Sequence, residues 1–171
     1  MTLFKNNCLI ACLAYLLTII GFLALTAGFF TPFWNVSEKG GTKTFSGLLM
    51  TCNSSFSCSF DIAQIEKFAN GDFSGIQIES MTLGIAGWVF GLLTLIFVMV
   101  YSCFPITVTG VLSIIAALIS GVTGVACVIM YGKGILTISE AAVSWSLGLY
   151  SGGSALMILV VIVLVINICV L

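Results

Sequence analysis

The sequence contains no histidine and no arginine, and only 11 of its 171 residues are charged, five Lys and six Asp or Glu. The missing histidine excludes imidazole acid–base chemistry and His-ligated metals, and the missing arginine excludes guanidinium clamps for phosphate. The sequence also has no basic patch of the kind that binds nucleic acid. Charged residues make up 6%, against about 25% in a soluble domain. Such a chain cannot cover a water-facing surface, which excludes a soluble enzyme or binding domain.

Uncharged apolar residues dominate the chain: 60% are hydrophobic, and the mean hydropathy is +1.27. No charged residue occurs in 6–37, 80–132 or 141–171. A membrane-spanning helix needs about 20 apolar residues. The first and last stretches each hold one span, and the middle stretch holds two because Pro105 interrupts it. The predicted spans are about 8–30, 81–104, 106–131 and 148–170.

These unbroken apolar runs favour helices over a transmembrane β-barrel, whose strands would show short alternating segments. We therefore expect residues 1–171 to form one all-α membrane domain, a four-span bundle. Both termini then lie on one face, with a long first loop at about 34–80 and a short last loop at about 132–146. No ionisable residue lies within a predicted span, so we expect no transport path through one protomer.

The first loop carries signs of the extracellular side. Cys52 and Cys58 are separated by five residues, and N-x-[ST] sequons begin at Asn35 and Asn53. Disulfides and N-glycans both form on the lumenal or extracellular side. Lysine placement alone does not decide the orientation. We expect a plasma-membrane protein with this loop outside and both termini in the cytoplasm.

The same loop changes from long apolar runs to short strand-like segments. Residues 33–37 and 45–52 form aromatic-rich or apolar segments, residues 58–62 alternate, and residues 39–43 form a turn. A Cys52–Cys58 bridge would join two strands across 53–57, which is worth about 2–2.5 kcal/mol in the chain-entropy model. This small sheet must rest on the helix ends. Residues 65–69 and 76–81 resemble a helical approach to the second span, and 134–139 a further edge strand.

Several residues within the spans have a packing interpretation and an alternative. The other cysteines are interpreted as small packing residues, with Cys103 and Cys12 as alternative S-palmitoylation sites. Five small-residue pairs at four-residue spacing are assigned to contacts inside the bundle, with contacts between copies as the alternative; the pairs are Ala24/Gly28, Gly87/Gly91, Ala117/Gly121, Ser120/Gly124 and Gly148/Gly152.

Polar and aromatic residues near the predicted helix ends are interpreted as membrane-interface residues. This set comprises Asn167, Trp88, Trp145, Tyr101, Tyr131 and Tyr150. No CxxC pair is present, so no metal site is expected. The predicted extracellular face also lacks a nucleophile–base pair. We expect no catalytic residue, no cofactor and no enzymatic activity.

The order Trp34, Gly47-Leu48-Leu49-x-x-Cys52, Cys58 resembles the W…GLW-x-x-C…C signature of the claudin and peripheral-myelin-protein/epithelial-membrane-protein superfamily. Leu49 stands where the signature has its second tryptophan. Residues 145–153 are similar to the family's fourth helix, which is rich in small residues. The resemblance implies four spans with a disulfide-linked extracellular sheet, and it implies that Trp34 is a wedge between sheet and bundle.

The resemblance also implies a function in cell adhesion. The first hypothesis is a claudin-like structural protein of cell–cell junctions that self-associates laterally in cis and meets neighbouring cells in trans through its loops, as a paracellular barrier or pore. Asp61 would then line the passage and favour cations. Alternatives are an auxiliary γ-like subunit of an ion channel or receptor, and a myelin-type or epithelial-membrane-type organiser of the membrane. Besides membrane lipid, we expect no PDZ-domain partner, because the sequence ends at Val170-Leu171 without a PDZ-ligand tail.

Overall fold

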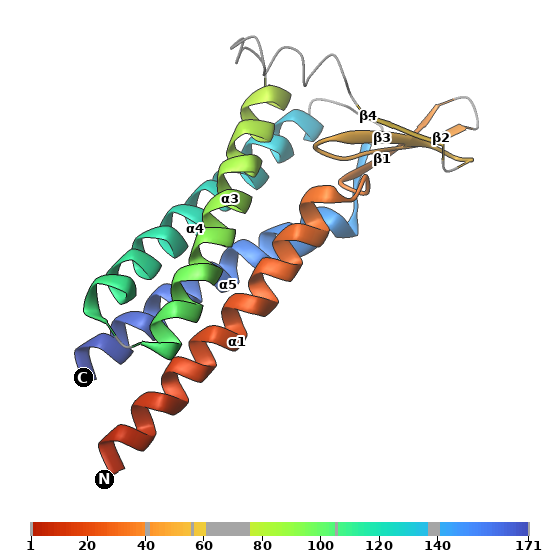
Figure 1. The fold of residues 1–171 in the computed structure, drawn as a ribbon. Coiled ribbons are helices and arrows are strands. Elements are labelled where there is room, and N and C mark those ends of the chain that lie inside the picture. The colour runs from red at the N-terminus through yellow and green to blue at the C-terminus, as the bar shows by residue number, and fades with distance from the viewer. Residues whose placement is uncertain are drawn as a thin grey trace.

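A computed structural model describes residues 2–39, 42–55, 57–60, 76–104, 106–136 and 141–170. Within these ranges the chain forms four long helices that run side by side, with both chain ends at the same end of the bundle (Figure 1). The predicted all-α bundle is confirmed. The helices are α1 (Thr2–Phe30), α3 (Ile76–Cys103), α4 (Thr107–Leu136) and α5 (Trp145–Val170).

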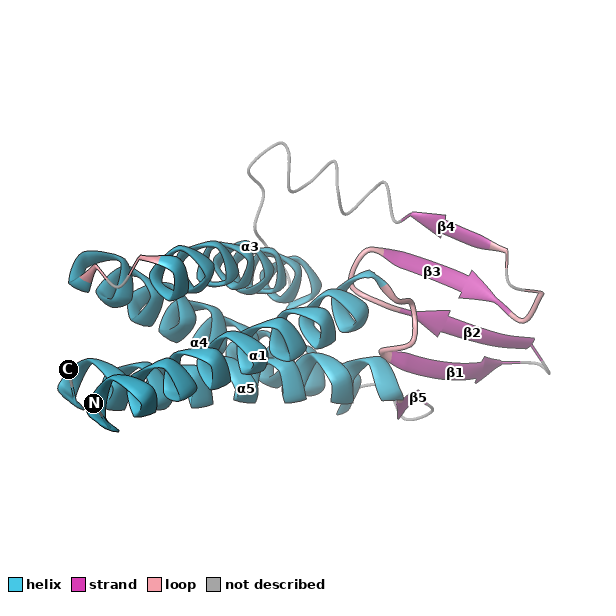
Figure 2. Ribbon diagram, turned by 60° about the horizontal axis from the view of Figure 1, so that its bottom comes forward, coloured by secondary structure: helices cyan, strands magenta, loops and turns pink. Residues whose placement is uncertain are grey.

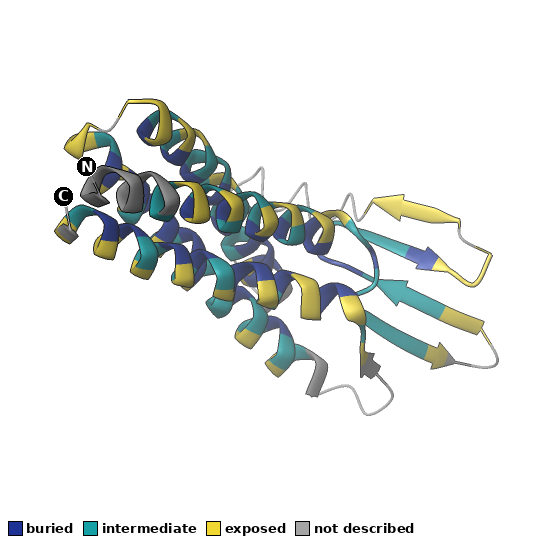
Figure 3. Ribbon diagram, turned by 90° about the horizontal axis from the view of Figure 1, so that it is seen from below, coloured by how far each residue is buried: buried dark blue, intermediate teal, exposed yellow. Residues whose placement is uncertain are grey.

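Each of these helices is long and apolar enough to cross a bilayer, over Ile10–Phe30, Ile78–Cys103, Thr107–Gly134 and Trp145–Cys169. Large apolar side chains lie on the outside of the bundle, for example Leu23 at 61% and Val122 at 55% exposed. Figure 3 shows exposed residues at intervals along the described parts of the helices. An apolar exterior of this length fits hydrocarbon and not water. The described part of the chain is that of a four-span integral membrane protein.

The interior of the bundle contains small hydroxyl residues. Thr18, Thr94, Ser113 and Ser154 are fully buried, and each donates its hydroxyl hydrogen to the carbonyl four residues earlier in its own helix. Ser120 instead donates to the carbonyl of Gly87 on α3, over 2.7 Å. Small polar residues inside and branched apolar residues outside are typical of helix packing in membranes.

Glycines bring most of the helices close together. A Cβ added at Gly28 would lie 2.7 Å from the Tyr150 nitrogen, and one at Gly121 would lie 2.6 Å from a side-chain carbon of Ile158. The pair Gly148/Gly152 differs, because a Cβ there would meet no atom within 4 Å. The prediction that all five small-residue pairs pack inside the bundle is therefore wrong for this pair, which lies on an open face of α5.

A small antiparallel sheet lies at the end of the bundle opposite the termini (Figure 2). Over the described ranges its strand order is β4-β3-β2-β1-β5. The first loop supplies four of these strands, and the last loop supplies β5. The strands are β1 (Asn35–Lys39), β2 (Thr42–Ser46), β3 (Met50–Asn53), β4 (Cys58–Phe60) and β5 (Ala141–Val143).

The loop boundaries differ from those expected. The last loop does add an edge strand, but at Ala141–Val143 and not at 134–139, because α4 continues to Leu136. Residues 76–81 are the beginning of α3 itself and not a separate approach to it. The predicted helical segment at 65–69 lies outside the described residues.

Candidate functional site: the sheet and its anchor on the bundle

Trp34 connects the sheet to three of the helices. Its side chain is fully buried, and its Nε1 donates a hydrogen bond to the carbonyl of Gly28 on α1 over 2.6 Å. Its ring lies 4.8 Å from that of Tyr131 on α4 and 5.2 Å from that of Tyr150 on α5, between ring centroids. Trp34 therefore occupies the wedge position between sheet and bundle that the resemblance implied.

The backbone of Trp34 joins the same anchor. Its N–H donates to the carbonyl of Ser46 at the end of β2 over 3.1 Å, and its carbonyl accepts from the N–H of Ser144 before α5 over 3.0 Å. These two bonds hold the beginning of β1 between its neighbours. The sheet is thereby fixed at one height on the bundle, because β1, which is paired on both sides, begins directly after the buried Trp34.

Gly47 and Leu48 form a second anchor, in the turn between β2 and β3. A Cβ at Gly47 would lie 2.6 Å from the carbonyl oxygen of Thr31, so only glycine fits against the chain that leaves α1. Leu48 is buried in the same core cluster as Trp34, Tyr131 and Tyr150, and Leu49 packs against this cluster. The Gly-Leu-Leu part of the signature therefore inserts an apolar turn into the helix bundle.

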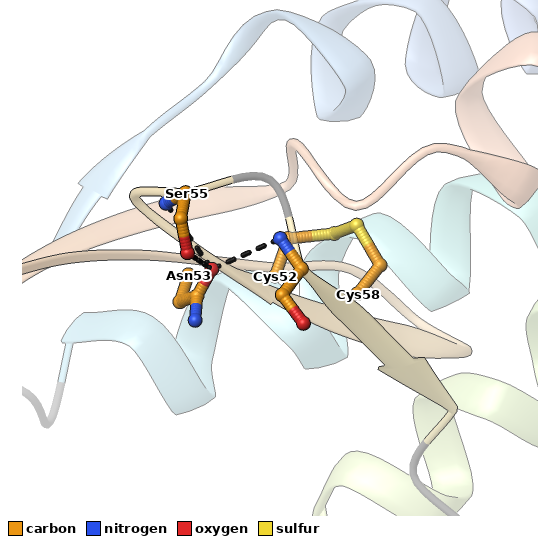
Figure 4. Close-up of a disulfide and its surroundings, with 5 residues drawn as sticks. Cys52, Asn53, Ser55 and Cys58 are labelled. Atoms are coloured by element: carbon orange, nitrogen blue, oxygen red, sulfur yellow. Dashed lines mark hydrogen bonds between the residues drawn. A yellow bond between two sulfur atoms is a disulfide. The ribbon is translucent and has the colours of Figure 1, made fainter.

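The disulfide joins β3 and β4, where Cys52 and Cys58 are paired residues. Cys52 is buried at 1% exposure, whereas Cys58 lies on the exposed strand β4. The predicted bridge is confirmed. Between the two cysteines, the Asn53 side-chain oxygen accepts hydrogen bonds from the N–H and the hydroxyl of Ser55 (Figure 4) and from the N–H of Ser57.

The two sequons occupy different environments. Asn35 is in β1, which is paired on both sides, and its Nδ2 donates to the Tyr131 hydroxyl over 3.2 Å. Asn53 is exposed at the end of β3. Of the two glycan acceptors that the sequence predicts, only Asn53 has its amide nitrogen free of a hydrogen bond to the described residues.

The described part of the sheet carries few charges, and both of its edge strands expose apolar side chains. Glu38 and Lys43 are paired at 3.8 Å near the β1–β2 turn, with both side chains more than half exposed, so the pair contributes little. Phe60 on the edge strand β4 is 59% exposed, and Val143 on the other edge, β5, is 63% exposed. Asp61, the predicted pore-lining charge, lies outside the described residues.

The cysteine side chains that the structure describes outside the bridge separate into two groups, whereas the side chain of Cys8 lies outside the described residues. Cys127 is buried and its thiol lies 3.1 Å from the carbonyl of Ser80, so it packs as predicted. Cys12, Cys103 and Cys169 are exposed, which contradicts the packing interpretation for them. S-palmitoylation of Cys103 and Cys12 stays a prediction. Within the part of the chain that the structure describes, no three His, Cys, Asp or Glu residues gather as a metal site.

Three tyrosines that the sequence did not identify as interior residues lie in the core of the bundle, two of them against Trp34. Tyr101, Tyr131 and Tyr150 are at most 7% exposed. Their interpretation as residues of the membrane interface is therefore wrong. The Tyr150 hydroxyl donates to the carbonyl of Gly84 on α3 over 2.9 Å. Trp145, in contrast, is 54% exposed at the beginning of α5 and fits the interface belt. The sequence contains the tyrosines and the glycines that they pack against, but it does not show which helices are adjacent, so these contacts could not be predicted.

Asn167 is also an interior residue and not an interface residue. It is 2% exposed, and its Nδ2 lies 3.2 Å from the Tyr101 hydroxyl, which accepts the hydrogen bond. Its Oδ1 is buried and has no partner among the described residues.

The sequence matches no protein-family model, and no curated protein matches it.

Proposed function

We propose that this protein is a claudin-like component of cell–cell contacts, which self-associates laterally and engages neighbouring cells through its extracellular sheet. The observation that carries the proposal is a disulfide-bonded sheet held on one end of a membrane bundle by the buried Trp34. Such a sheet is a rigid platform with exposed edges, and rigid platforms bind at a low cost in ordering.

The extracellular orientation rests on the Cys52–Cys58 bridge and the exposed Asn53 sequon of the same hairpin. Both modifications belong to the oxidising side of a membrane. The termini, at the opposite end of the bundle (Figure 1), then face the cytoplasm. The test is labelling of intact cells with a membrane-impermeant maleimide after mild reduction. We expect label that depends on Cys52 and Cys58, and label found only after permeabilisation would contradict the orientation.

Lateral self-association is supported by the open face of α5. Gly148 and Gly152 lie on it with no neighbouring atom within 4 Å of an added Cβ, while the adjacent Trp145 and Leu149 are 54% and 38% exposed. In a bilayer, small residues allow two helices to approach closely, so that dispersion between backbones stabilises the pair. The occupant that we propose for this face is the same face of a second copy.

Substitution of the two glycines tests this interface. We expect the double variant Gly148→Ile/Gly152→Ile to lower energy transfer between differently labelled copies in cell membranes. Gly132→Ile on α4 is the matched control, because Gly132 also meets no atom within 4 Å. Equal loss in both variants, or no loss in either, would contradict an α5 interface.

Contact between cells is tested by expression in cells that lack junctions. We expect the protein to concentrate where two expressing cells meet and not where an expressing cell meets a non-expressing one. If a paracellular passage forms, Asp61→Asn lowers its preference for cations, measured as a transepithelial dilution potential. Diffuse surface label, together with co-purification of a channel or receptor, would favour the auxiliary-subunit hypothesis instead.

A further inference from the structure

The β3–β4 hairpin holds the Asn53 side chain in a defined state. Its Oδ1 accepts hydrogen bonds from the N–H of Ser55 at 3.2 Å, the hydroxyl of Ser55 at 2.7 Å and the N–H of Ser57 at 3.0 Å. The backbone closes the same turn, because the Asn53 N–H donates to the Ser57 carbonyl over 3.1 Å. The Asn53 oxygen is thus fully engaged, while its nitrogen bonds to none of the described residues.

The disulfide keeps this arrangement closed. Cys52 and Cys58 directly flank the turn on paired strands, and Figure 4 shows the bridge beside the hydrogen bonds of Asn53. Because β4 has three residues and lies at the sheet edge, its pairing is weak without a cross-link. Reduction of the thiols would remove this cross-link and allow the sequon to open into an extended segment that an enzyme cleft can bind.

We propose that Asn53 is the N-glycan acceptor of this protein and that it accepts the glycan only before the Cys52–Cys58 disulfide closes. The inference rests on the extracellular orientation proposed above. The donor is an oligosaccharide linked through a diphosphate to a lipid. The Asn53 nitrogen forms a bond to the anomeric carbon, the bond from that carbon to the diphosphate oxygen breaks, and the nitrogen loses a proton to a base of the transferase. The lipid diphosphate leaves, and nothing is oxidised or reduced.

The order follows from the chemistry of the amide. An amide nitrogen is a poor nucleophile because its lone pair is delocalised into the carbonyl. Three hydrogen bonds to Oδ1 stabilise that delocalised form and leave the closed hairpin a poor acceptor. Once the glycan is attached, the same oxygen still accepts these bonds and the nitrogen still faces away from them. The glycosylated hairpin can therefore close its disulfide afterwards.

The experiment compares glycan occupancy in cultured animal cells, read as a gel-mobility shift that a glycan-removing amidase reverses. We expect synthesis under a thiol oxidant to lower the shifted fraction of the wild type and a reductant to raise it. In Cys52→Ala/Cys58→Ala the shifted fraction is high and insensitive to both reagents. Cys103→Ala/Cys169→Ala, which removes two thiols outside the hairpin, is the matched control and behaves as the wild type.

Sequon variants identify the acceptor. Asn53→Gln abolishes the shift, whereas Asn35→Gln leaves it unchanged, because the pairing of β1 with β2 and β5 and the bond from the Asn35 nitrogen to Tyr131 do not depend on the Cys52–Cys58 bridge. A shift that depends on Asn35, or a shifted fraction that ignores the redox reagents in the wild type, overturns the inference.

Failure of the inference and failure of the proposed function give different results. If no variant is glycosylated although impermeant maleimide labels Cys52 and Cys58 on intact, reduced cells, this inference is wrong and the orientation stands. If these thiols are labelled only after permeabilisation, the orientation is wrong and the inference falls with it.

Discussion

The indole nitrogen of Trp34 donates its hydrogen to the carbonyl oxygen of Gly28, 2.6 Å away and six residues earlier in the chain. Gly28 is in the last turn of α1, where the helix leaves carbonyls without partners. One side chain therefore supplies a hydrogen-bond donor to a carbonyl at the end of α1 and also fixes the beginning of β1. The sheet and the bundle are parts of one packed unit, because the residue between them belongs to both.

Loss of this bond should destabilise the whole protein. Trp34→Phe keeps most of the ring but leaves the buried Gly28 carbonyl without its donor, which costs about 1–3 kcal/mol. Trp34→Ala also opens a cavity and should cost about 3–5 kcal/mol. Thermal unfolding in detergent micelles measures both variants. Phe104→Leu is the control, because Phe104 is 65% exposed and lies at the other end of the bundle. A Trp34→Phe melting temperature equal to that of wild type would show that the bond contributes nothing.

Glycine-to-alanine changes should separate the packed face of the bundle from the open one. Gly28→Ala places a methyl group 2.7 Å from the Tyr150 nitrogen, and overpacking of this kind costs about 1–3 kcal/mol. Gly148→Ala meets no atom within 4 Å and gains helix propensity of up to about 1 kcal/mol. The melting temperatures in detergent should therefore move in opposite directions. Parallel changes would mean that Gly148 is covered in the isolated protein.

The disulfide should stabilise the hairpin and not the helices. Closing so short a loop is worth about 2 kcal/mol in the chain-entropy model, and Cys52→Ala/Cys58→Ala removes it. Amide hydrogen exchange is expected to accelerate in β3 and β4, while the helix interiors keep their protection. Ser59→Ala is the control, because Ser59 lies on the same exposed strand and leaves the bridge intact. Faster exchange throughout α1 and α5 would instead mean that the bridge stabilises the entire fold.

The helices were predictable from sequence, because the solvent imposes a simple rule on them. The charged residues lie outside the long apolar stretches 6–37, 80–132 and 141–171. Because a charge is costly inside the bilayer, these uncharged stretches mark the spans. The disulfide was predictable from Cys52 and Cys58, since both lie in one short polar segment. The edge strand β5 was misplaced because α4 and the last loop share the same apolar composition, so no local signal marks where the helix ends.

The tyrosines could not be placed by sequence for a different reason. Tyr131 and Tyr150 lie near helix ends, as membrane-interface residues do, and only the arrangement of neighbouring helices shows that they face Trp34. The open position of Gly148 is likewise invisible in sequence, because the same spacing packs tightly around Gly28 and Gly87. Sequence periodicity identifies a small-residue face but not what lies opposite it.

The buried pair Asn167 and Tyr101 should be replaceable by apolar residues. The Asn167 Oδ1 has no partner among the described residues, and an unpaired buried polar atom costs about 1–3 kcal/mol. Tyr101→Phe alone removes the partner of Nδ2 and should lower the melting temperature in detergent. The double variant Asn167→Leu/Tyr101→Phe leaves no unpaired group and should melt at or above the wild-type temperature.

The single variants Tyr101→Phe and Asn167→Leu complete a double-mutant cycle for this pair. A double variant that melts well below both single variants would mean that the Asn167 oxygen has a donor in the bilayer, such as a bound water held between α3 and α5. In that case the pair stabilises the termini end of the bundle, and its loss should also accelerate hydrogen exchange at the last turns of α3 and α5. Unchanged exchange there, with a melting temperature at or above wild type, is expected if the orphan oxygen is a net cost.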